Sequence, residues 1–288
     1  FLQELQSIYD FGWRSNVFIV DDNFISNKAK TKELLKELIP WMKERKYPFK
    51  FIIQASINLA EDDELLYLMK EANFIKAFVG LESPSNESLK YCGKMQNVGK
   101  DIPAAVKKIH SYGIQVMAGF IVGFDTDTEE IFTLQEKFIQ KIKVVKAMIG
   151  PLVAAPLTPL TAKLERENRL TGDTTGVNDD TGINFIPKMG LENLLSGYKR
   201  LKRNVYRRKY YYRRIHAFLK DYKYSARGGN NLSWEKFMAF LKTILYIGIF
   251  SGDSPYYWRL VIYTVFRKTK SFSTVLEMAV ERRYLAKS

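Results

Sequence analysis

Two hydrophobic periods alternate along the first two thirds of this sequence, and that alternation restricts the possible folds more than any other feature. Short apolar runs of strand length occupy residues 16–21, 49–55, 75–81, 115–122 and 146–153. Stretches with helical spacing lie between them, at residues 28–45, 62–72, 101–112 and 127–141. Because strand and helix follow each other without hairpin signals, the sequence predicts an α/β fold of parallel strands with helical crossovers. A helical pattern at residues 2–9 opens the chain, and in such a repeat we expect a strand before it.

Capping residues support these helix boundaries. Asp62 and Asp63 stand just before a helical stretch, and Asp127 is followed three residues later by Glu130, which predicts N-terminal caps. Gly113 stands just past a helix end, where a glycine is favoured.

Charge divides the chain near Lys188. Residues 1–188 carry 24 Lys/Arg and 25 Asp/Glu, whereas residues 189–288 carry 21 Lys/Arg and only 6 Asp/Glu. Twelve of the 17 tyrosines lie in the second part. This shift predicts a domain boundary between residues 188 and 189. The second part is helical by pattern, with candidates at residues 191–222, 234–250 (capped by Ser233), 256–268 and 272–283.

Polar residues and glycines follow the predicted strands, at the edge where parallel α/β folds place their chemistry. Asp21 and Asp22 end the first strand, Gln54 and Ser56 follow the second, and Glu82 ends the third. The fourth strand carries bare glycines and ends at Asp125, and residues 151–159 end the fifth. Carboxylates suit sugar hydroxyls or an ammonium group, and glycines allow a flat base to approach the backbone. Helix capping explains Asp21, Asp22 or Asp125 taken singly, but five converging strand ends favour a binding site.

The small number of cysteines and histidines excludes disulfides and several kinds of metal site. One cysteine, Cys92, allows no internal disulfide and fits a reducing cytoplasm. One cysteine and two histidines cannot build a closed zinc site or hold an iron–sulfur cluster by themselves, so we predict no metal ligands in this chain. His110 and His216 lie in helical patterns without a partner motif, which argues against catalysis by either.

Several segments resemble radical S-adenosylmethionine (SAM) enzymes of the cobalamin-binding type. The segments are residues 17–24, 79–89, 93–97 and 113–130, and the resemblance covers roughly residues 1–215. The piece Gly80-Leu81-Glu82-Ser83 is similar to the fourth-strand region of that fold, and residues 119–127 are similar to its fifth strand. The resemblance implies a partial (β/α)6 barrel that lacks its first strand (residues 1–188), followed by an all-helical domain (residues 189–288).

The resemblance also implies roles for individual residues. Glu82 would bind the ribose hydroxyls or the amino group of SAM, and Lys94 would pair with its carboxylate. Adenine would rest on the strand that carries Gly119, Ile121 and Gly123. Asp21 and Asp22 would lie near the methionine end of SAM or the substrate, and Gln54 and Ser56 would line the barrel mouth. A helix cap at Glu82 and a solvated Lys94 remain the alternatives from the residues alone.

One motif of the family has no counterpart here, namely the CxxxCxxC loop that holds a [4Fe–4S] cluster after the first strand. A truncation before Phe1 explains the missing loop and the missing strand together. The expected cofactors are SAM, a [4Fe–4S] cluster whose ligands lie outside this chain, and cobalamin. The expected activity of the full-length protein, a transferase, is cleavage of SAM to a 5′-deoxyadenosyl radical with cobalamin-dependent methyl transfer to a small molecule or lipid. The chain as given is expected to be inactive.

The basic second part admits three interpretations. Residues 199–214 contain nine Lys/Arg and no acid, interleaved with tyrosines. A helical domain that packs on the rest of the protein ranks first, and peripheral contact with the inner face of a membrane ranks second, through Arg207, Arg208, Arg213, Arg214 and the apolar residues 237–250. Nucleic acid ranks third. The alternative to the enzyme is therefore a non-catalytic basic binding protein for a lipid surface or nucleic acid.

Overall fold

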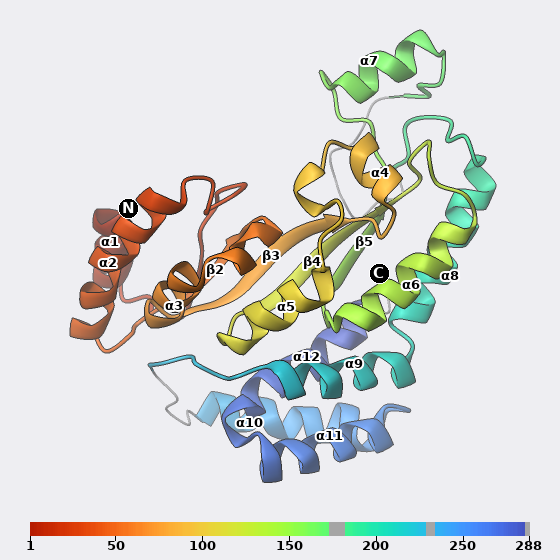
Figure 1. Cartoon of the computed structure of the whole chain (residues 1–288). Helices are drawn as coiled ribbons and strands as arrows, with labels where there is room; N and C mark the ends of the chain where they lie inside the picture. Colours follow the sequence, from red (N-terminus) through yellow and green to blue (C-terminus); the bar gives the residue numbers. More distant parts are fainter. Residues whose placement is uncertain (173–181, 229–233, 286–288) are drawn as a thin grey trace.

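A parallel sheet of five strands forms the centre of the protein. The computed structural model describes the whole chain except residues 173–181, 229–233 and 286–288, and the side chains of residues 235–237. The strands are β1 (Asn16–Phe18), β2 (Lys50–Gln54), β3 (Phe74–Glu82), β4 (Gln115–Val122) and β5 (Ala147–Pro151). They are all parallel and follow sequence order across the sheet, which confirms the predicted fold class. Figure 1 shows the sheet curled, with α7 at one end of the molecule and α10 and α11 at the other.

The strand β1 forms one edge of the described sheet, as predicted. It pairs with β2 alone and is shorter than the predicted run. The ladder ends at Ile19, which donates to the Ile52 carbonyl at 2.9 Å, and Val20 beyond it is 85% exposed.

Helices connect the strands, most of them at the predicted places, although those at residues 86–91 and 159–166 were not predicted. They are α1 (Leu2–Asp10), α2 (Lys28–Glu44), α3 (Asp63–Glu71), α4 (Asn86–Tyr91), α5 (Ile102–Ser111), α6 (Glu130–Ile142) and α7 (Pro159–Arg166), with short 3-10 turns η1 (Ile57–Glu61) and η2 (Met95–Asn97). Asp62 caps α3 by accepting from the Leu65 N–H at 2.9 Å, as predicted. The predicted cap at Asp127 is wrong, because α6 begins at Glu130 and the Asp127 carboxylate accepts from Gly123 and Phe124 instead.

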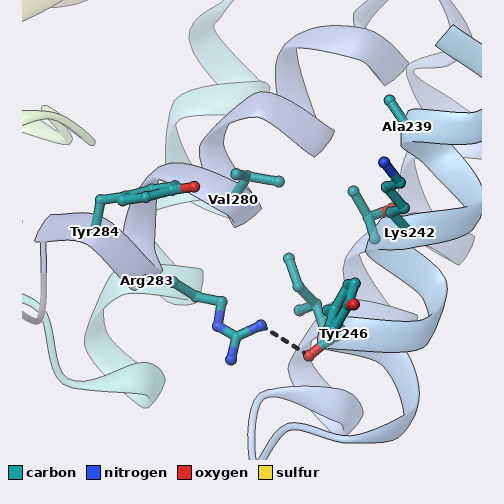
Figure 2. Close-up of a pocket in the computed structure, with 8 residues that line it drawn as sticks. Ala239, Lys242, Tyr246, Val280, Arg283 and Tyr284 are labelled. Atoms are coloured by element: carbon teal, nitrogen blue, oxygen red, sulfur yellow. Dashed lines mark hydrogen bonds between the residues drawn. The ribbon is translucent and has the colours of Figure 1, made fainter. Parts of the chain in front are cut away.

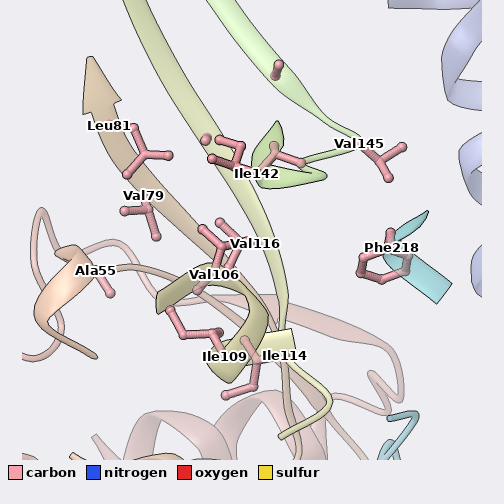
Figure 3. Packing of buried hydrophobic residues seen from close by; sticks show 14 of the residues in the cluster. Ala55, Val79, Leu81, Val106, Ile109, Ile114, Val116, Ile142, Val145 and Phe218 are labelled. Carbon is pink, nitrogen blue, oxygen red and sulfur yellow. The ribbon is translucent and has the colours of Figure 1, made fainter. Parts of the chain in front are cut away.

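Burial alternates along the strands and separates the two faces of the sheet. On β4, Ala118 and Phe120 are buried, whereas Gly119 and Ile121 are partly exposed. The buried face packs against the crossover helices, and Figure 3 shows Val79, Leu81 and Val116 beside Val106 and Ile109 of α5. The other face of β2, β3 and β4 stays partly open, so side chains such as Gln54 and Phe78 remain accessible from that side.

The second part of the chain is helical, as predicted, with one correction. Its elements are α8 (Leu191–Val205), α9 (Arg208–Asp221), α10 (Trp234–Thr243), the π-helix η3 (Ile244–Ile249), α11 (Ser254–Arg267), the 3-10 turn η4 (Thr269–Ser271) and α12 (Phe272–Leu285). The single helix predicted over residues 191–222 is two helices, because Arg207 is extended and the Tyr206 hydroxyl bonds the backbone of Ala147. The predicted cap Ser233 lies outside the described residues.

Ion pairs join this helical part to the amino ends of the strands. Lys76 of β3 pairs with Glu277 of α12, and Lys146 pairs with Glu281 at 3.1 Å. Phe218 of α9 and Met278 of α12 belong to the same hydrophobic core as the sheet. The helical part therefore packs on the core of the sheet, whereas the boundary at residues 188–189 and the role of the basic residues stay predictions. No described helix is long and apolar enough to cross a membrane.

Candidate functional site

Strained backbone marks the carboxyl end of β3. Glu82 has a φ of 61°, in the left-handed region that non-glycine residues rarely adopt, and the register with β4 shifts between Gly80 and Glu82. Such a conformation costs about 1–3 kcal/mol and persists at functional sites where the surroundings enforce it. The bend folds the Glu82 carboxylate back over Gly80, where a Cβ would collide with it. The absence of a side chain at Gly80 is therefore needed for the position of Glu82.

Lys94 and Asn97 complete this cluster from the segment after α4. The Lys94 ammonium lies 3.0 Å from Glu82 Oε1, and its side chain is 36% exposed. The Asn97 amide donates to the carbonyls of Gly80 and Leu81 at 3.0 and 3.3 Å. Its Oδ1 is buried and has no partner among the described residues, so an acceptor beside Glu82 is available to a ligand donor. Sequence reasoning predicted Glu82 and Lys94 but missed Asn97, although it closes the quoted 93–97 segment.

The loops after β1 and β2 lie together. Asn23 Oδ1 accepts from the Ser56 N–H at 3.0 Å, and Asp21 Oδ1 accepts from the Asn23 N–H at 2.8 Å. Asp21 and Asp22 are exposed, whereas Gln54 and Ser56 are partly buried. Gln54 is in register with Phe78 of β3, which places it on the open face of the sheet. The structure thus brings four predicted residues to one edge, and their roles stay predictions.

The predicted residues Gly119 and Ile121 of β4, and Gly123 just after it, have packing roles of their own. A Cβ on Gly119 would lie 3.0 Å from the Phe78 ring, and one on Gly123 would lie 2.7 Å from Leu194 of α8. Gly123 has a φ of 101°, and its N–H donates to Asp127 Oδ2 at 2.8 Å, so that N–H is not available to an adenine base. Ile121 packs partly buried against a small apolar cluster around Phe124 and Leu164.

Asp127 ties two loops together below the site. Its carboxylate accepts from the Ser88 hydroxyl at 2.7 Å and from the N–H groups of Gly123 and Phe124. Burial raises the pKa of this carboxyl despite those hydrogen bonds. The residue therefore fixes the turn after β4 against α4.

Asp125 holds the α7 segment over the end of β4. Arg169 binds its carboxylate with two hydrogen bonds, at 2.6 and 3.0 Å, and Lys163 lies 2.7 Å away. Arg169 first and Lys163 second hold the pKa of Asp125 well below its usual range. Helix capping, the alternative considered for Asp125, is not what the structure shows. Sequence reasoning missed these partners because they lie 38 and 44 residues away along the chain.

Cysteine and histidine have no catalytic arrangement in the described part. The Cys92 thiol is partly buried, and burial raises its pKa. His110 is buried against Phe218, and burial lowers its pKa to about 3. Among the described residues, no group of three His, Cys, Asp or Glu could hold a metal ion.

Sequence comparisons find named relatives. A family model described as a domain of unknown function (DUF4070) matches residues 158–287. An uncharacterized methyltransferase of Synechocystis is 42% identical over 198 residues, which cover 68% of this chain and 37% of that protein. Hopanoid C-2 methylase of Rhodopseudomonas palustris is 37% identical over 185 residues, which cover 64% of this chain and 34% of that protein. The chain thus spans little more than a third of the length of these relatives.

Structural comparisons show the same fold in solved enzymes. The radical SAM methyltransferase TsrM from Kitasatospora setae, solved with cobalamin and a [4Fe–4S] cluster, matches 98% of this chain and 55% of its own with a TM-score of 0.52 at 15% identity. The cobalamin-dependent radical SAM enzyme OxsB, solved with aqua-cobalamin, matches 99% of this chain and 48% of its own with a TM-score of 0.51 at 14% identity. At these identities the likeness establishes the fold alone.

Proposed function

Because this chain belongs to the radical SAM enzymes of the cobalamin-binding type, we propose that the whole protein is a methyltransferase. The observation that carries the proposal is identity of 42% and 37% with proteins named as methyltransferase and methylase, over 198 and 185 residues. The strained Glu82 and its neighbours, at the carboxyl end of the sheet, support it as a SAM site.

The residues at the end of β3 suit SAM chemically. SAM carries an ammonium group, a carboxylate and ribose hydroxyls, and on cleavage it supplies a methyl group or a 5′-deoxyadenosyl radical. Glu82 and Asn97 Oδ1 accept hydrogen bonds from the ammonium or the hydroxyls, and Lys94 pairs with the carboxylate. Lys94 also holds the Glu82 carboxylate in place over Gly80.

The residues of this chain cannot hold a [4Fe–4S] cluster. The sequence has one cysteine, and the described residues contain no group of three metal ligands. The whole protein provides those ligands from outside this sequence in our proposal, in line with a relative of which the matched residues cover only 37%. No catalytic step is assigned to the residues of this chain, and inactivity of the chain by itself is part of the proposal.

The substrate class stays open between a small molecule and a lipid. One relative is named for a hopanoid, and another, 26% identical over 189 residues, is bacteriochlorophyllide d C-12(1)-methyltransferase of Chlorobaculum tepidum. These names differ too much to select one substrate. The predicted cytoplasmic location and the non-catalytic alternative also stay predictions.

Calorimetric titration of the chain with SAM tests the proposed site. We expect Glu82→Gln to weaken binding about 30-fold, because a charged acceptor contributes about 2 kcal/mol. Glu87→Gln on α4 is the matched control, since Glu87 is exposed and one short helix away, and it should bind SAM as the unaltered chain does. Equal affinity of the two variants would contradict the assignment of Glu82.

Methyl transfer is tested on the whole protein, reconstituted with its cluster and cobalamin. We expect isotopic label from the methyl group of SAM to appear in product, and Glu82→Gln to raise the SAM concentration required. Turnover that releases 5′-deoxyadenosine without any transfer of label would place the enzyme in another class of radical chemistry.

A further inference from the structure

Large apolar side chains gather on the surface of one helical hairpin, formed by α10, η3 and α11. On α11, Trp258, Ile262 and Phe266 are exposed at intervals of four residues. On the other arm, Leu245 and Ile249 of η3 are exposed, and Phe250 follows at 78%. We call this surface the hairpin face, with the members Leu245, Ile249, Phe250, Trp258, Ile262, Val265 and Phe266. The two arms contact each other, and exposed apolar side chains gathered on neighbouring helices indicate an interaction site.

The hairpin is already packed beneath this face. Ile247, Tyr257 and Val261 are buried together with Ala279 of α12. Gly248 lets the rings of Tyr257 and Trp258 approach closely, and its carbonyl accepts from Trp258 Nε1 at 2.9 Å. The hairpin therefore has its own buried core, and the exposed apolar side chains of the hairpin face lie outside it.

The same helices, η4 and α12 carry cations without acidic partners. Lys242, Arg259, Arg267 and Lys270 are exposed, Arg283 is partly buried, and none of the five forms an ion pair with a described residue. Residues 238–272 contain one carboxylate, Asp253, which is buried and bound by Arg282 and Arg208. The surface consequently combines apolar side chains with uncompensated positive charge.

A pocket of about 480 Å³ opens beside the hairpin face, between the α10–η3 arm and α12. Figure 2 shows Lys242 and Tyr246 on one wall and Val280, Arg283 and Tyr284 on the other. Arg283 donates to the Tyr246 carbonyl at 3.0 Å, which fixes its guanidinium at the pocket. Two cations thus meet an apolar and aromatic wall, which suits an anionic head group joined to an apolar chain.

We propose that the hairpin face docks on an anionic lipid membrane, with one lipid phosphate bound between Lys242 and Arg283. Apolar side chains enter the boundary between head groups and acyl chains, and the surrounding cations meet the anionic head groups. A second copy of this chain fits less well, because it would bring the same unpaired cations together. Nucleic acid does not explain exposed aliphatic side chains such as Ile249 and Ile262.

The structure changes which residues carry this interaction. Of the four arginines that the sequence suggested, Arg214 is 1% exposed and Arg208 lies 2.7 Å from the Asp253 carboxylate. Arg214 therefore serves the packing of α9 and Arg208 is held by Asp253, whereas Arg207 and Arg213 are exposed and their contact with a membrane stays a prediction. Docking through the hairpin also leaves the carboxyl ends of the strands at the opposite end of the molecule, away from the lipid (Figure 1).

Sedimentation of the full chain with vesicles tests the apolar contribution. We expect binding to vesicles of phosphatidylcholine mixed with phosphatidylglycerol, with a remainder that resists salt. The triple variant Ile249→Ser, Phe250→Ser, Phe266→Ser should lose at least roughly tenfold in affinity. The matched control is Phe11→Ser, Val20→Ser, Leu157→Ser, which removes three exposed apolar side chains elsewhere and should bind normally. Equal loss in both triples would overturn the proposal.

Charge variants test the pocket and the surrounding cations. Lys242→Gln with Arg283→Gln should weaken binding about 25-fold, at about fivefold for each charge. Lys30→Gln with Lys43→Gln removes the same charge from exposed positions of α2 and is the control, expected to change little. Equal binding to vesicles of phosphatidylcholine alone would overturn the proposal. If the chain forms a dimer and binds no vesicles, and if the triple variant at Ile249, Phe250 and Phe266 dissociates that dimer, the hairpin face is an interface between copies instead.

Discussion

Among the described residues, two sets of buried polar atoms without partners lie in different surroundings, which give them different meanings. At the end of β3, Asn97 Oδ1 lies beside a strained Glu82 and a partly exposed Lys94. In the interior, where α5 meets the helical part, the unpaired atoms of Arg214 lie among the rings of Tyr206 and Tyr211, and those of His110 of α5 lie against Phe218. The atoms of both sets are buried and cannot hydrogen-bond to bulk water. Only the first lies next to a residue that solvent, and hence a ligand, can reach.

The comparison teaches that an unpaired polar atom indicates a ligand only where its neighbours are accessible and strained. Elsewhere it is a destabilising feature that the surrounding packing outweighs. Substitutions in the helical region should therefore change stability and leave SAM binding alone, whereas those around Glu82 should do the reverse.

The largest effect is expected in the helical region, at Asp253. Its carboxylate binds Arg282 at 2.6 and 2.9 Å, and both side chains are buried. Asp253→Ala leaves the Arg282 charge uncompensated and should lower the free energy of unfolding by about 4 kcal/mol. Urea unfolding measures it, with Asp63→Ala as the control because the Asp63 ion pair with Lys108 is exposed. Comparable stability of the two variants, or loss of SAM binding with Asp253→Ala in folded protein, would break the comparison.

A smaller loss is expected at Gly123, on the carboxyl side of the sheet. Alanine there is forced into a left-handed conformation, and its Cβ approaches Leu194, so Gly123→Ala should be less stable by about 2 kcal/mol. Gly150→Ala is the control, because no neighbouring atom lies within 4 Å of its Cβ position. If the additional change Leu194→Ala restores none of the loss, packing against α8 is not the reason for this glycine.

The pH dependence of the free energy of unfolding tests the contribution of His110. Burial lowers its pKa from 6.5 to about 3, so between these values the folded state binds fewer protons than the unfolded chain. Stability contributed by the neutral form therefore falls as the pH drops below about 6.5, by at most about 1.4 kcal/mol for each pH unit. His110→Leu should remove this decline and leave SAM binding unchanged. Parallel curves for the two proteins, from urea midpoints at a series of pH values, would refute the assignment.

The smallest effect is expected at Glu82, with the opposite sign. Glycine accepts a φ of 61° without strain, so Glu82→Gly should raise the free energy of unfolding by about 1 kcal/mol while SAM binding is lost. Glu82→Gln keeps the strain and loses the charge, so it should gain no stability. A Glu82→Gly variant that binds SAM normally would remove the strained carboxylate from the proposed site.

The sequence predicts the local elements better than the contacts between them. Strand positions and direction follow from the alternation of apolar runs, since each run must pair with its neighbour through a helical crossover. The break between α8 and α9 could not be predicted, because the Tyr206 contact with Ala147 joins residues 59 positions apart. The partners of Asp125 were missed for the same reason. Glu82 was found from its place at a strand end and from resemblance to a family, but no local pattern shows that its backbone is strained.

The exposed edge at β1 affects how the protein behaves in solution. A strand that pairs on one side presents a row of unused N–H and C=O groups, and here Phe18 and Val20 add exposed apolar surface beside it. Such an edge is a template for intermolecular pairing and aggregation. A concentrated chain can thus form pellets without any lipid, so a vesicle-free spin belongs beside every sedimentation measurement. A proline at Phe18, whose N–H points away from β2 because Ile19 and Ser15 make the ladder bonds, should prevent strand addition at this edge and separate aggregation from membrane binding.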